Sequence, residues 1–335
     1  MKKIFFTMVA IAAMAACTKS EVQYEQQQEI GFAPVTKKTT KSAEADTEYN
    51  IALPMYIFAN TYADGTPTSF TVPYFANAKF TNRENKIFGG ADASYYWPNV
   101  KTLVFSGLSK SGNVNIDNSE TEAVEGSVPV YSDNHIVLEG YAPGYGANEQ
   151  GDNDLMWFST TSPYAKQQNA IEVTMKHACA WVTLNFKGDD ITGAAVNPWT
   201  ITNVSFAGLS QSGNVVLGET AAWTIDTATP CEVFSGSEAL TEQNKDFTKT
   251  YGNFKDLVVV PQAAQTLSVS YTYESDPNNH IEFTETKVIP LTFGADNIWN
   301  AGVHYTYNIT ITTSEILVEP KVAAWDPNVV TNVEF

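Results

Sequence analysis

The chain has 335 residues, a net charge of −18 at pH 7 and a pI near 4.5. Arg83 is its only arginine, and no group of lysines is large enough to follow a phosphate backbone. Nucleic acid and anionic membrane surfaces are therefore poor partners, and we expect no nucleic acid to bind.

The first 16 residues have the pattern of an export leader. Lys2 and Lys3 give a positive start, and residues 4–16 form an apolar run too short to span a bilayer. Small residues precede Cys17, as a lipoprotein signal peptidase requires, so the pattern resembles a bacterial lipobox. We expect acylation of Cys17, with chains such as palmitate, to tether the protein to a membrane. The alternative is an ordinary secretory leader with an incidental cysteine.

Residues 29–35 form one short predicted strand ahead of the main body. Ile30 and Phe32 alternate with small residues, so one face of this strand offers two apolar side chains. A polar, basic stretch follows at once and includes Lys38 and Lys41, which a protease with basic specificity could reach. This order indicates a chain that is exported on a lipid and cut later.

The remainder of the chain predicts short strands separated by turn residues, with almost no helical periodicity. This pattern is typical of an all-β protein built from sandwiches. A polar linker at residues 160–169 divides two strand-rich halves, and about 318 residues after the leader favour two domains. We predict a signal peptide at 1–16, a lipidated segment with a removable strand at 17–41, and domains at 42–165 and 166–335. The expected strands are residues 50–59, 100–105, 135–138, 170–176, 180–186, 199–206, 257–260, 267–273, 287–293 and 305–312.

The sequence offers little catalytic chemistry. Cys179 and Cys231 either pair or remain buried thiols, and sequence alone leaves both possibilities open. His177 and Cys179 share a strand face, but no Asn or Asp partner can be identified, so a core or interface histidine is favoured. No histidine has a metal-ligand partner at short spacing. We expect no enzyme activity, no cofactor and no metal.

Several aromatic residues offer an alternative reading as a platform on which sugars stack. Core positions within strands are favoured for them over sugar binding. They are Tyr95, Tyr96, Trp97, Trp157 and Trp181.

A series of sequence blocks, in order along most of the mature chain, resembles the fimbrillin family. The clearest block spans residues 299–309, with the sequence Trp-Asn-Ala-Gly-Val-His-Tyr-Thr-Tyr-Asn-Ile. The other blocks are residues 95–98 with 103–105, 154–157, 175–182, 260–262 with 267–271, and 322–325.

The resemblance implies subunits of type V pili, or their anchor and tip relatives, with two tandem transthyretin-like β-sandwich domains. Such a subunit reaches the outer membrane as a lipoprotein, and a trypsin-like protease then removes an N-terminal strand. A strand from the next subunit, commonly from its C-terminal end, fills the vacated groove. The family's processing often uses arginine, and this leader region has none. Lys38 and Lys41 could replace it; otherwise the lipid stays and the protein is an anchor or surface lipoprotein.

We therefore expect a fimbrial subunit or accessory protein for cell adhesion, located in a surface fimbrium or on the outer membrane. Its partners are other fimbrial subunits and possible host proteins or glycans. The alternative is a surface lipoprotein that binds glycans. For strand exchange, residues 29–35 would give way to residues 315–335 of a neighbour. The apolar side chains expected to take part are Ile30, Phe32, Val329, Val333 and Phe335.

Replacing Cys17 with Ala should abolish both metabolic lipid labelling and membrane retention, because the thiol is the only expected acylation site of a lipobox-like leader. Labelling with a fatty-acid analogue and membrane fractionation check this. Unchanged labelling of the variant would show that Cys17 is not the acylated residue.

Overall fold

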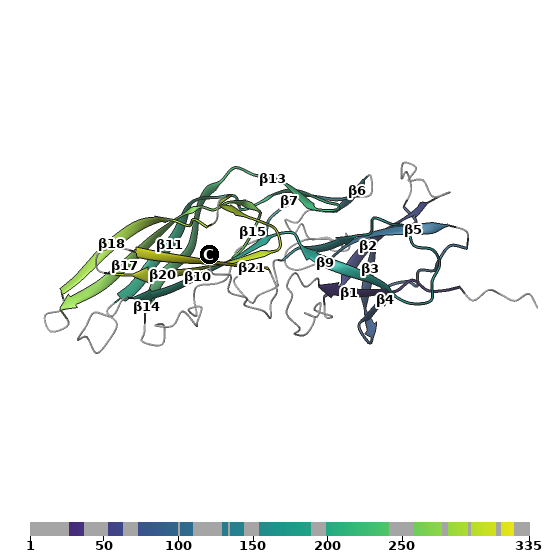
Figure 1. Cartoon of the computed structure of the whole chain (residues 1–335), viewed down its shortest axis with the longest axis horizontal. Coiled ribbons are helices and arrows are strands. Elements are labelled where there is room, and N and C mark those ends of the chain that lie inside the picture. The colour runs from purple at the N-terminus through teal and green to yellow at the C-terminus, as the bar shows by residue number, and fades with distance from the viewer. Residues whose placement is uncertain are drawn as a thin grey trace, which may run out of the picture.

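The computed structural model describes residues 27–36, 53–62, 73–99, 101–109, 129–132, 135–143, 154–188, 199–240, 257–276, 281–293, 296–312 and 316–324. These residues form strands, turns and extended segments without any helix, which confirms the all-β expectation. Consequently no helix in the described ranges is long and apolar enough to cross a membrane. The strands gather into two lobes along the long axis, with a smaller sheet spanning the region between them (Figure 1).

The first lobe is a sheet of seven strands that closes on itself in the order β1-β4-β3-β2-β5-β8-β9. Its inner face is apolar and rich in aromatic rings because alternate residues of each strand point inward. The closure was not predicted from the strand pattern, since it depends on long-range pairing of β1. The strands are β1 (Phe32–Thr36), β2 (Met55–Tyr62), β3 (Phe75–Glu84), β4 (Ile87–Gly90), β5 (Thr102–Ser109), β8 (Met156–Ser159) and β9 (Ile171–His177).

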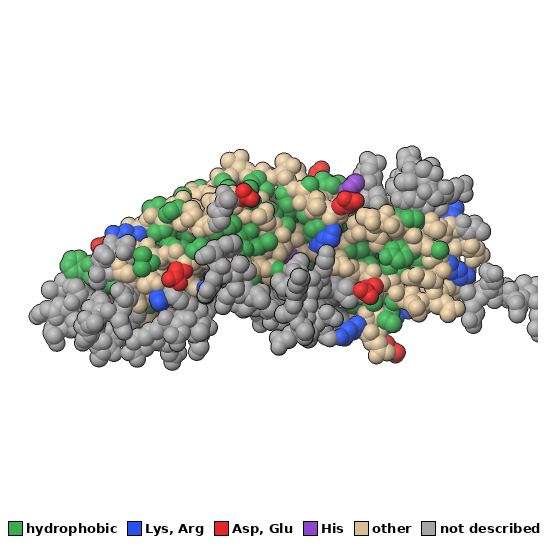
Figure 2. All heavy atoms as spheres, in the orientation of Figure 1, with side chains coloured by type: hydrophobic (Ala, Val, Ile, Leu, Met, Phe, Trp, Pro, Cys, Tyr) green, Lys and Arg blue, Asp and Glu red, His purple; other side chains and the backbone are tan. Residues whose placement is uncertain are grey.

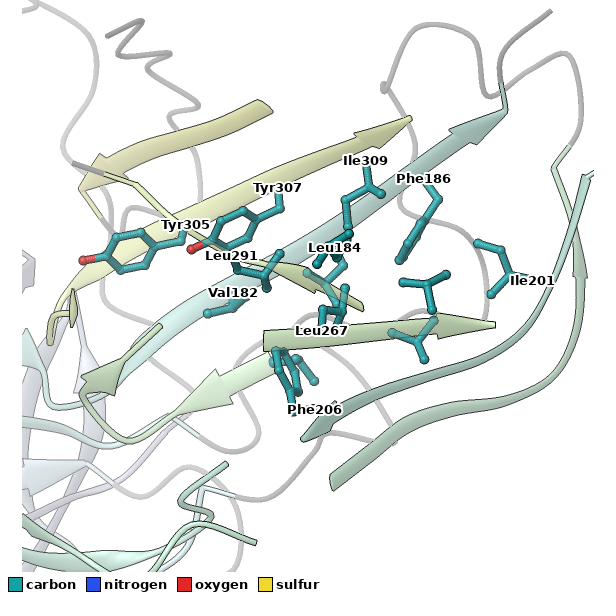
Figure 3. Packing of buried hydrophobic residues seen from close by; sticks show 14 of the residues in the cluster. Val182, Leu184, Phe186, Ile201, Phe206, Leu267, Leu291, Tyr305, Tyr307 and Ile309 are labelled. Atoms are coloured by element: carbon teal, nitrogen blue, oxygen red, sulfur yellow. The ribbon is translucent and has the colours of Figure 1, made fainter. Parts of the chain in front are cut away.

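The second lobe packs two four-stranded sheets face to face. One sheet has the order β15-β10-β20-β21 and the other β14-β11-β17-β18. Their facing side chains form one apolar core, in which β10, β20, β11 and β17 contribute interleaved residues (Figure 3). The strands are β10 (Ala180–Gly188), β11 (Trp199–Leu209), β14 (Thr229–Ala239), β15 (Leu257–Val259), β17 (Thr266–Asp276), β18 (Ile281–Pro290), β20 (Val303–Ile311) and β21 (Ile316–Ala324), with the short pair β16 (Gln262–Ala263) and β19 (Ile298–Trp299) beside them.

A third sheet joins the two halves of the sequence in the order β13-β12-β7-β6. The hairpin of β12 (Gly213–Leu217) and β13 (Ala221–Ile225) pairs with β7 (His135–Tyr141), which in turn pairs with β6 (Val130–Ser132). The sheet covers a separate apolar core that includes Tyr56, Leu108 and Trp157 from strands of the first lobe. We call this the junction core.

Two indole groups tie the β12–β13 hairpin to the segment between β9 and β10 and to β8. Trp223 donates from Nε1 to the carbonyl oxygen of Ala178 at 2.8 Å. Trp157 of β8 donates from Nε1 to the carbonyl oxygen of Gly218 at 3.1 Å. Buried hydrogen bonds of this kind fix orientation as well as packing. The lobes are therefore connected by pairing, packing and hydrogen bonds, in addition to the chain itself.

The expected division between residues 165 and 166 falls in the connection between β8 and β9. The segment after it contributes β9 to the first lobe's sheet before the chain enters the second lobe. The two cysteines lie apart in different cores: Cys179 belongs to the junction core and Cys231 to the second lobe's core, and both are free thiols.

Replacing Leu217 with Ala should lower the free energy of unfolding by about 2–5 kcal/mol, because its side chain is fully buried in the junction core. Val216 is the matched control on the same strand; its side chain is 38% exposed, so Val216→Ala should cost less than about 1 kcal/mol. Urea unfolding followed by tryptophan fluorescence measures both. Equal losses in the two variants would show that burial in the junction core does not add to the free energy of unfolding.

Candidate functional site: the closing strand of the first lobe

Strand β1 closes the first lobe by pairing on both of its edges. It runs parallel to β9, with pairs from Phe32–Ile171 to Thr36–Met175, and it meets β4 at the antiparallel pair Phe32–Phe88. We call the space between β4 and β9 that β1 fills the slot. Without β1, the facing edges of β4 and β9 would expose backbone donors and acceptors, which is the condition that invites an incoming strand.

The inner face of β1 and the residues just before it are deeply buried. Ile30 and Phe32 are 0% exposed, and Pro34 is buried as well. The ring of Phe32 packs edge-on against Phe80 and Phe105, with centroid distances of 5.2 and 5.1 Å. Each such side chain contributes about 1.5–3 kcal/mol through removal from water. Ile30 and Phe32, the two apolar side chains predicted to share one face of this strand, therefore occupy adjacent inward positions in the slot.

Residues 28–31 lead into the slot along a second backbone ladder. The amide of Ile30 donates to the carbonyl oxygen of Tyr95 at 2.8 Å, and the amide of Trp97 donates to that of Gln28 at 2.9 Å. On the opposite edge, the amide of Ile171 donates to the carbonyl oxygen of Gly31 at 2.8 Å. The strand is thus held by main-chain hydrogen bonds that any strand of matching register can make.

One ion pair marks the entry of the slot. Glu29 Oε1 lies 2.8 Å from Arg83 Nη1, with side chains that are about one third and just under one half exposed. Arg83 also donates from Nη2 to the carbonyl oxygen of Gly90 at 2.7 Å. Because the pair is partly exposed, it contributes no more than about 1 kcal/mol.

The local backbone explains why Arg83 reaches this position. The pairing of β3 with β4 shifts register between Asn82 and Glu84, so Arg83 lies at a bulge, which re-aims a side chain. The two-residue turn that follows has positive φ at Asn85 (50°) and Lys86 (64°), as a type I′ hairpin requires. These features could not be read from the sequence, since the turn lacks the usual glycine.

Most of the other site residues predicted from sequence lie outside the described residues: Cys17, Lys38, Lys41, Val329, Val333 and Phe335. The predicted C-terminal donor segment begins at Glu315, which lies outside the described residues, and its residues 316–324 form β21. This strand is the edge of its sheet and pairs antiparallel with β20 from Ile311–Ile316 to Val303–Ala324. None of its side chains is fully buried, and Leu317 is 48% exposed.

The structure supplies a partner that sequence reasoning missed for His177. Its Nδ1 lies 2.6 Å from Oδ2 of Asp154, whose side chain is 4% exposed. Asp154 precedes β8 and is separated from His177 by 22 residues, so no local spacing signals the pair. Cys179 nearby is fully buried, and burial, followed by the charge of Asp154, raises the pKa of its thiol well above the usual range. A neutral, inaccessible thiol is no nucleophile, so these residues form a structural contact of the junction.

The aromatic residues considered for sugar stacking are largely inaccessible. Trp97, Trp157 and Trp181 are 3–7% exposed, and only Tyr96, at 37%, presents a ring to solvent. Trp181 stacks on His304 with ring centroids 3.8 Å apart, and burial lowers the pKa of that imidazole to about 4. The aromatic platform of the glycan-binding alternative is therefore absent from the described surface.

No patch of charge of one sign on the face in Figure 2, and no metal-binding cluster in the described ranges, marks a binding site. Charged side chains of these residues are scattered singly over the face seen in Figure 2, without a large patch of one sign. No three metal-binding side chains cluster within the described ranges. A shallow pocket of about 300 Å³ lies between β8 and β9, lined mainly by hydroxyl side chains from residues 159–164 and by Glu172, Thr174 and Lys176.

A family model described as fimbrillin-like matches residues 18–325. The chain belongs to the fimbrillin-like family. This confirms the resemblance seen in the sequence and assigns the chain to structural rather than catalytic proteins. No curated protein matches the sequence.

Solved structures share the fold of this fimbrillin-like chain at low sequence identity. A fimbrial protein from Bacteroides vulgatus is 15% identical with a TM-score of 0.63, covering 89% of this chain and 100% of its own. A proposed cell adhesion protein from Bacteroides uniformis is 16% identical with a TM-score of 0.52, covering 89% and 99%. Another from Bacteroides ovatus is 12% identical with a TM-score of 0.54, covering 91% and 99%.

Replacing Phe32 with Ala should lower the free energy of unfolding of the first lobe by about 3–5 kcal/mol, because it removes a fully buried ring from the slot. In protein cut between residues 36 and 42, the same change should speed release of the N-terminal fragment. Size-exclusion chromatography of the cut protein measures that release. Ala33→Ser, on the outer face of β1, is the control and should leave release unchanged.

Proposed function

We propose that this protein is a subunit or accessory protein of a surface fimbrium for cell adhesion, and that it assembles by strand addition. The observation that carries the proposal is the position of β1: a single N-terminal strand closes the first lobe and is held on both edges. Family membership supports association with other fimbrial subunits. The similar structure from Bacteroides vulgatus is that of a fimbrial protein, which agrees with this role.

A sequence echo supports the choice of donor. Residues 29–34 read Glu-Ile-Gly-Phe-Ala-Pro, and residues 315–320 read Glu-Ile-Leu-Val-Glu-Pro. Glu, Ile and Pro recur at the same spacing, and an apolar residue stands between Ile and Pro in both. In β21, Ile316 and Val318 pack against the second lobe's core, as Ile30 and Phe32 pack inward in the first lobe. The two segments therefore carry the same inward pattern.

The exchange is energetically feasible because both strands are paired before it: β1 fills the slot, and β21 pairs with β20 in its own sheet. After cutting near Lys38 or Lys41, the N-terminal fragment is held only by noncovalent contacts and can dissociate. An empty slot leaves buried backbone groups without partners, at about 1–3 kcal/mol for each group, and an incoming strand restores them. None of the side chains of β21 is itself fully buried, so its departure removes only partly buried residues from the second lobe's core.

We further propose that residues 315–322 fill the slot and that residues 323–335, with Val329, Val333 and Phe335, continue beyond its end. Acylated Cys17 would hold the precursor at the outer membrane until it is cut. Where the cut does not occur, the retained lipid suits an anchor. We also propose that the two lobes correspond to the expected transthyretin-like domains, with β9, which follows the expected division at residues 165 and 166, belonging to the first of them.

Cross-linking between copies tests the register. Ala33 lies opposite Glu172 in the β1–β9 pair, so residue 319 of a donor would take that place. Neighbouring strands lie about 4.8 Å apart, within the range that a disulfide can bridge. A Glu172→Cys chain mixed with a Glu319→Cys chain, both starting after Cys17 and cut near Lys38, should form disulfide-linked dimers.

The uncut mixture is the control, because the chain's own β1 then occupies the slot. Non-reducing electrophoresis and mass spectrometry identify the linked peptides. Equal linking in cut and uncut protein, or none after cutting, would contradict exchange at this slot. Ala33→Cys with Glu172→Cys in one uncut chain shows that the position can form a disulfide.

A further inference from the structure

We propose that Arg83 sets the register of the incoming strand by binding Glu315 of a second copy in the place that Glu29 occupies in the chain's own strand. This inference rests on the proposed strand addition and adds to it a specificity-determining residue. It starts from an asymmetry in composition: in a chain of net charge −18, the single arginine lies at the entry of the slot and pairs with the residue that begins the echoed motif.

The surrounding backbone fixes the position of the Arg83 guanidinium. The bulge between Asn82 and Glu84 directs it toward the slot, and the carbonyl oxygen of Gly90 accepts from its Nη2. A Cβ on Gly89 would lie 2.6 Å from the guanidinium carbon of Arg83, so the absence of a side chain at 89 leaves the space that the arginine occupies. A planar guanidinium held in this way suits a carboxylate partner better than a flexible ammonium does.

The backbone of the slot selects Glu315 over Glu319, the next acidic residue of the donor segment. The amide of residue 30 donates to the carbonyl oxygen of Tyr95, so the residue after the paired glutamate must have an N–H group. Ile316 provides one, whereas Pro320, which follows Glu319, does not. The register with Glu315 opposite Arg83 is therefore the one that keeps this hydrogen bond.

Two further positions fit the same register. Pro320 would fall where Pro34 already lies, so the slot makes no use of an amide there. Leu317 would replace Gly31, where a Cβ would meet Ile87 Cγ2 at 3.4 Å, an ordinary contact distance. Leu317 and Ile87 are 48% and 43% exposed in the separate chain, and the exchange would bring these two apolar side chains together.

In the same register, Glu319 of the donor would make one unfavourable contact, and this contact provides a matched control. Residue 33 lies opposite Glu172, so Glu319 of the donor would face a like charge there. Neutralising Glu315 should therefore weaken binding, and neutralising Glu319 on the same strand should not. A general loss of negative charge cannot produce opposite effects at the two positions.

The experiment uses the full mature chain with a specific protease site at residues 39–40, cut and then mixed with a fluorescent peptide of residues 313–323. Fluorescence anisotropy measures the affinity of the peptide for the cut protein. We expect the Glu315→Gln peptide to bind about two- to five-fold more weakly than the unchanged peptide, as for a partly exposed ion pair. We expect the Glu319→Gln peptide to bind equally well or more tightly.

Variants of Arg83 and of Gly89 beside it complete the test. The Glu315→Arg peptide should bind the unchanged slot poorly and recover on an Arg83→Glu slot, a charge reversal that excludes misfolding as the cause of the first loss. Gly89→Ala keeps every charge but displaces the guanidinium, and it should abolish the difference between the Glu315 and Glu315→Gln peptides.

The outcomes separate this inference from the proposed function. If the unchanged peptide binds only cut protein but Glu315→Gln has no effect, strand addition stands and the role of Arg83 is wrong. If the unchanged peptide does not bind cut protein at all, both the donor assignment and this inference are wrong.

Discussion

The fold of the first lobe depends on one strand that belongs to the chain's N-terminus. A seven-stranded sheet closes only because β1 pairs with β9 on one edge and β4 on the other, and because Phe32 fills the centre of the aromatic core. In the strand addition that we propose, the features that make β1 necessary would also allow its replacement. Its affinity comes from main-chain hydrogen bonds and a short row of inward side chains, both of which another strand of this sequence can supply.

The rest of the molecule links that slot to β21, the proposed donor strand, in the other lobe. The β12–β13 hairpin pairs with β7, and the junction core packs against β2, β5 and β8, so the two lobes share a sheet and a core (Figure 1). The buried contact between Asp154 and His177 lies at the same crossing. In the filament that we propose, pulling force would pass from the slot in one lobe to β21 in the other through this junction. Shared packing suits that load better than a flexible linker would.

The sequence predicted the strand-rich class and most central strands, because residues such as 171–176 and 180–186 alternate apolar and polar side chains over a clear period of two. It did not predict β3 or β14, whose sequences contain Asn, Gly, Pro and charged residues and whose stability comes from their neighbours. Ile30 and Phe32 were identified by alternation alone. Arg83 and Asp154 were not, since each meets its partner through pairing across distant segments, which local spacing cannot reveal.

The most direct measurement is a structure of the assembled filament by electron cryomicroscopy, at a resolution that distinguishes side chains in the slot between β4 and β9. The account predicts that the slot holds residues 315–322 of a neighbouring subunit, with Ile316 and Val318 in the places of Ile30 and Phe32. A filament in which each slot still holds its own residues 29–36 would contradict it.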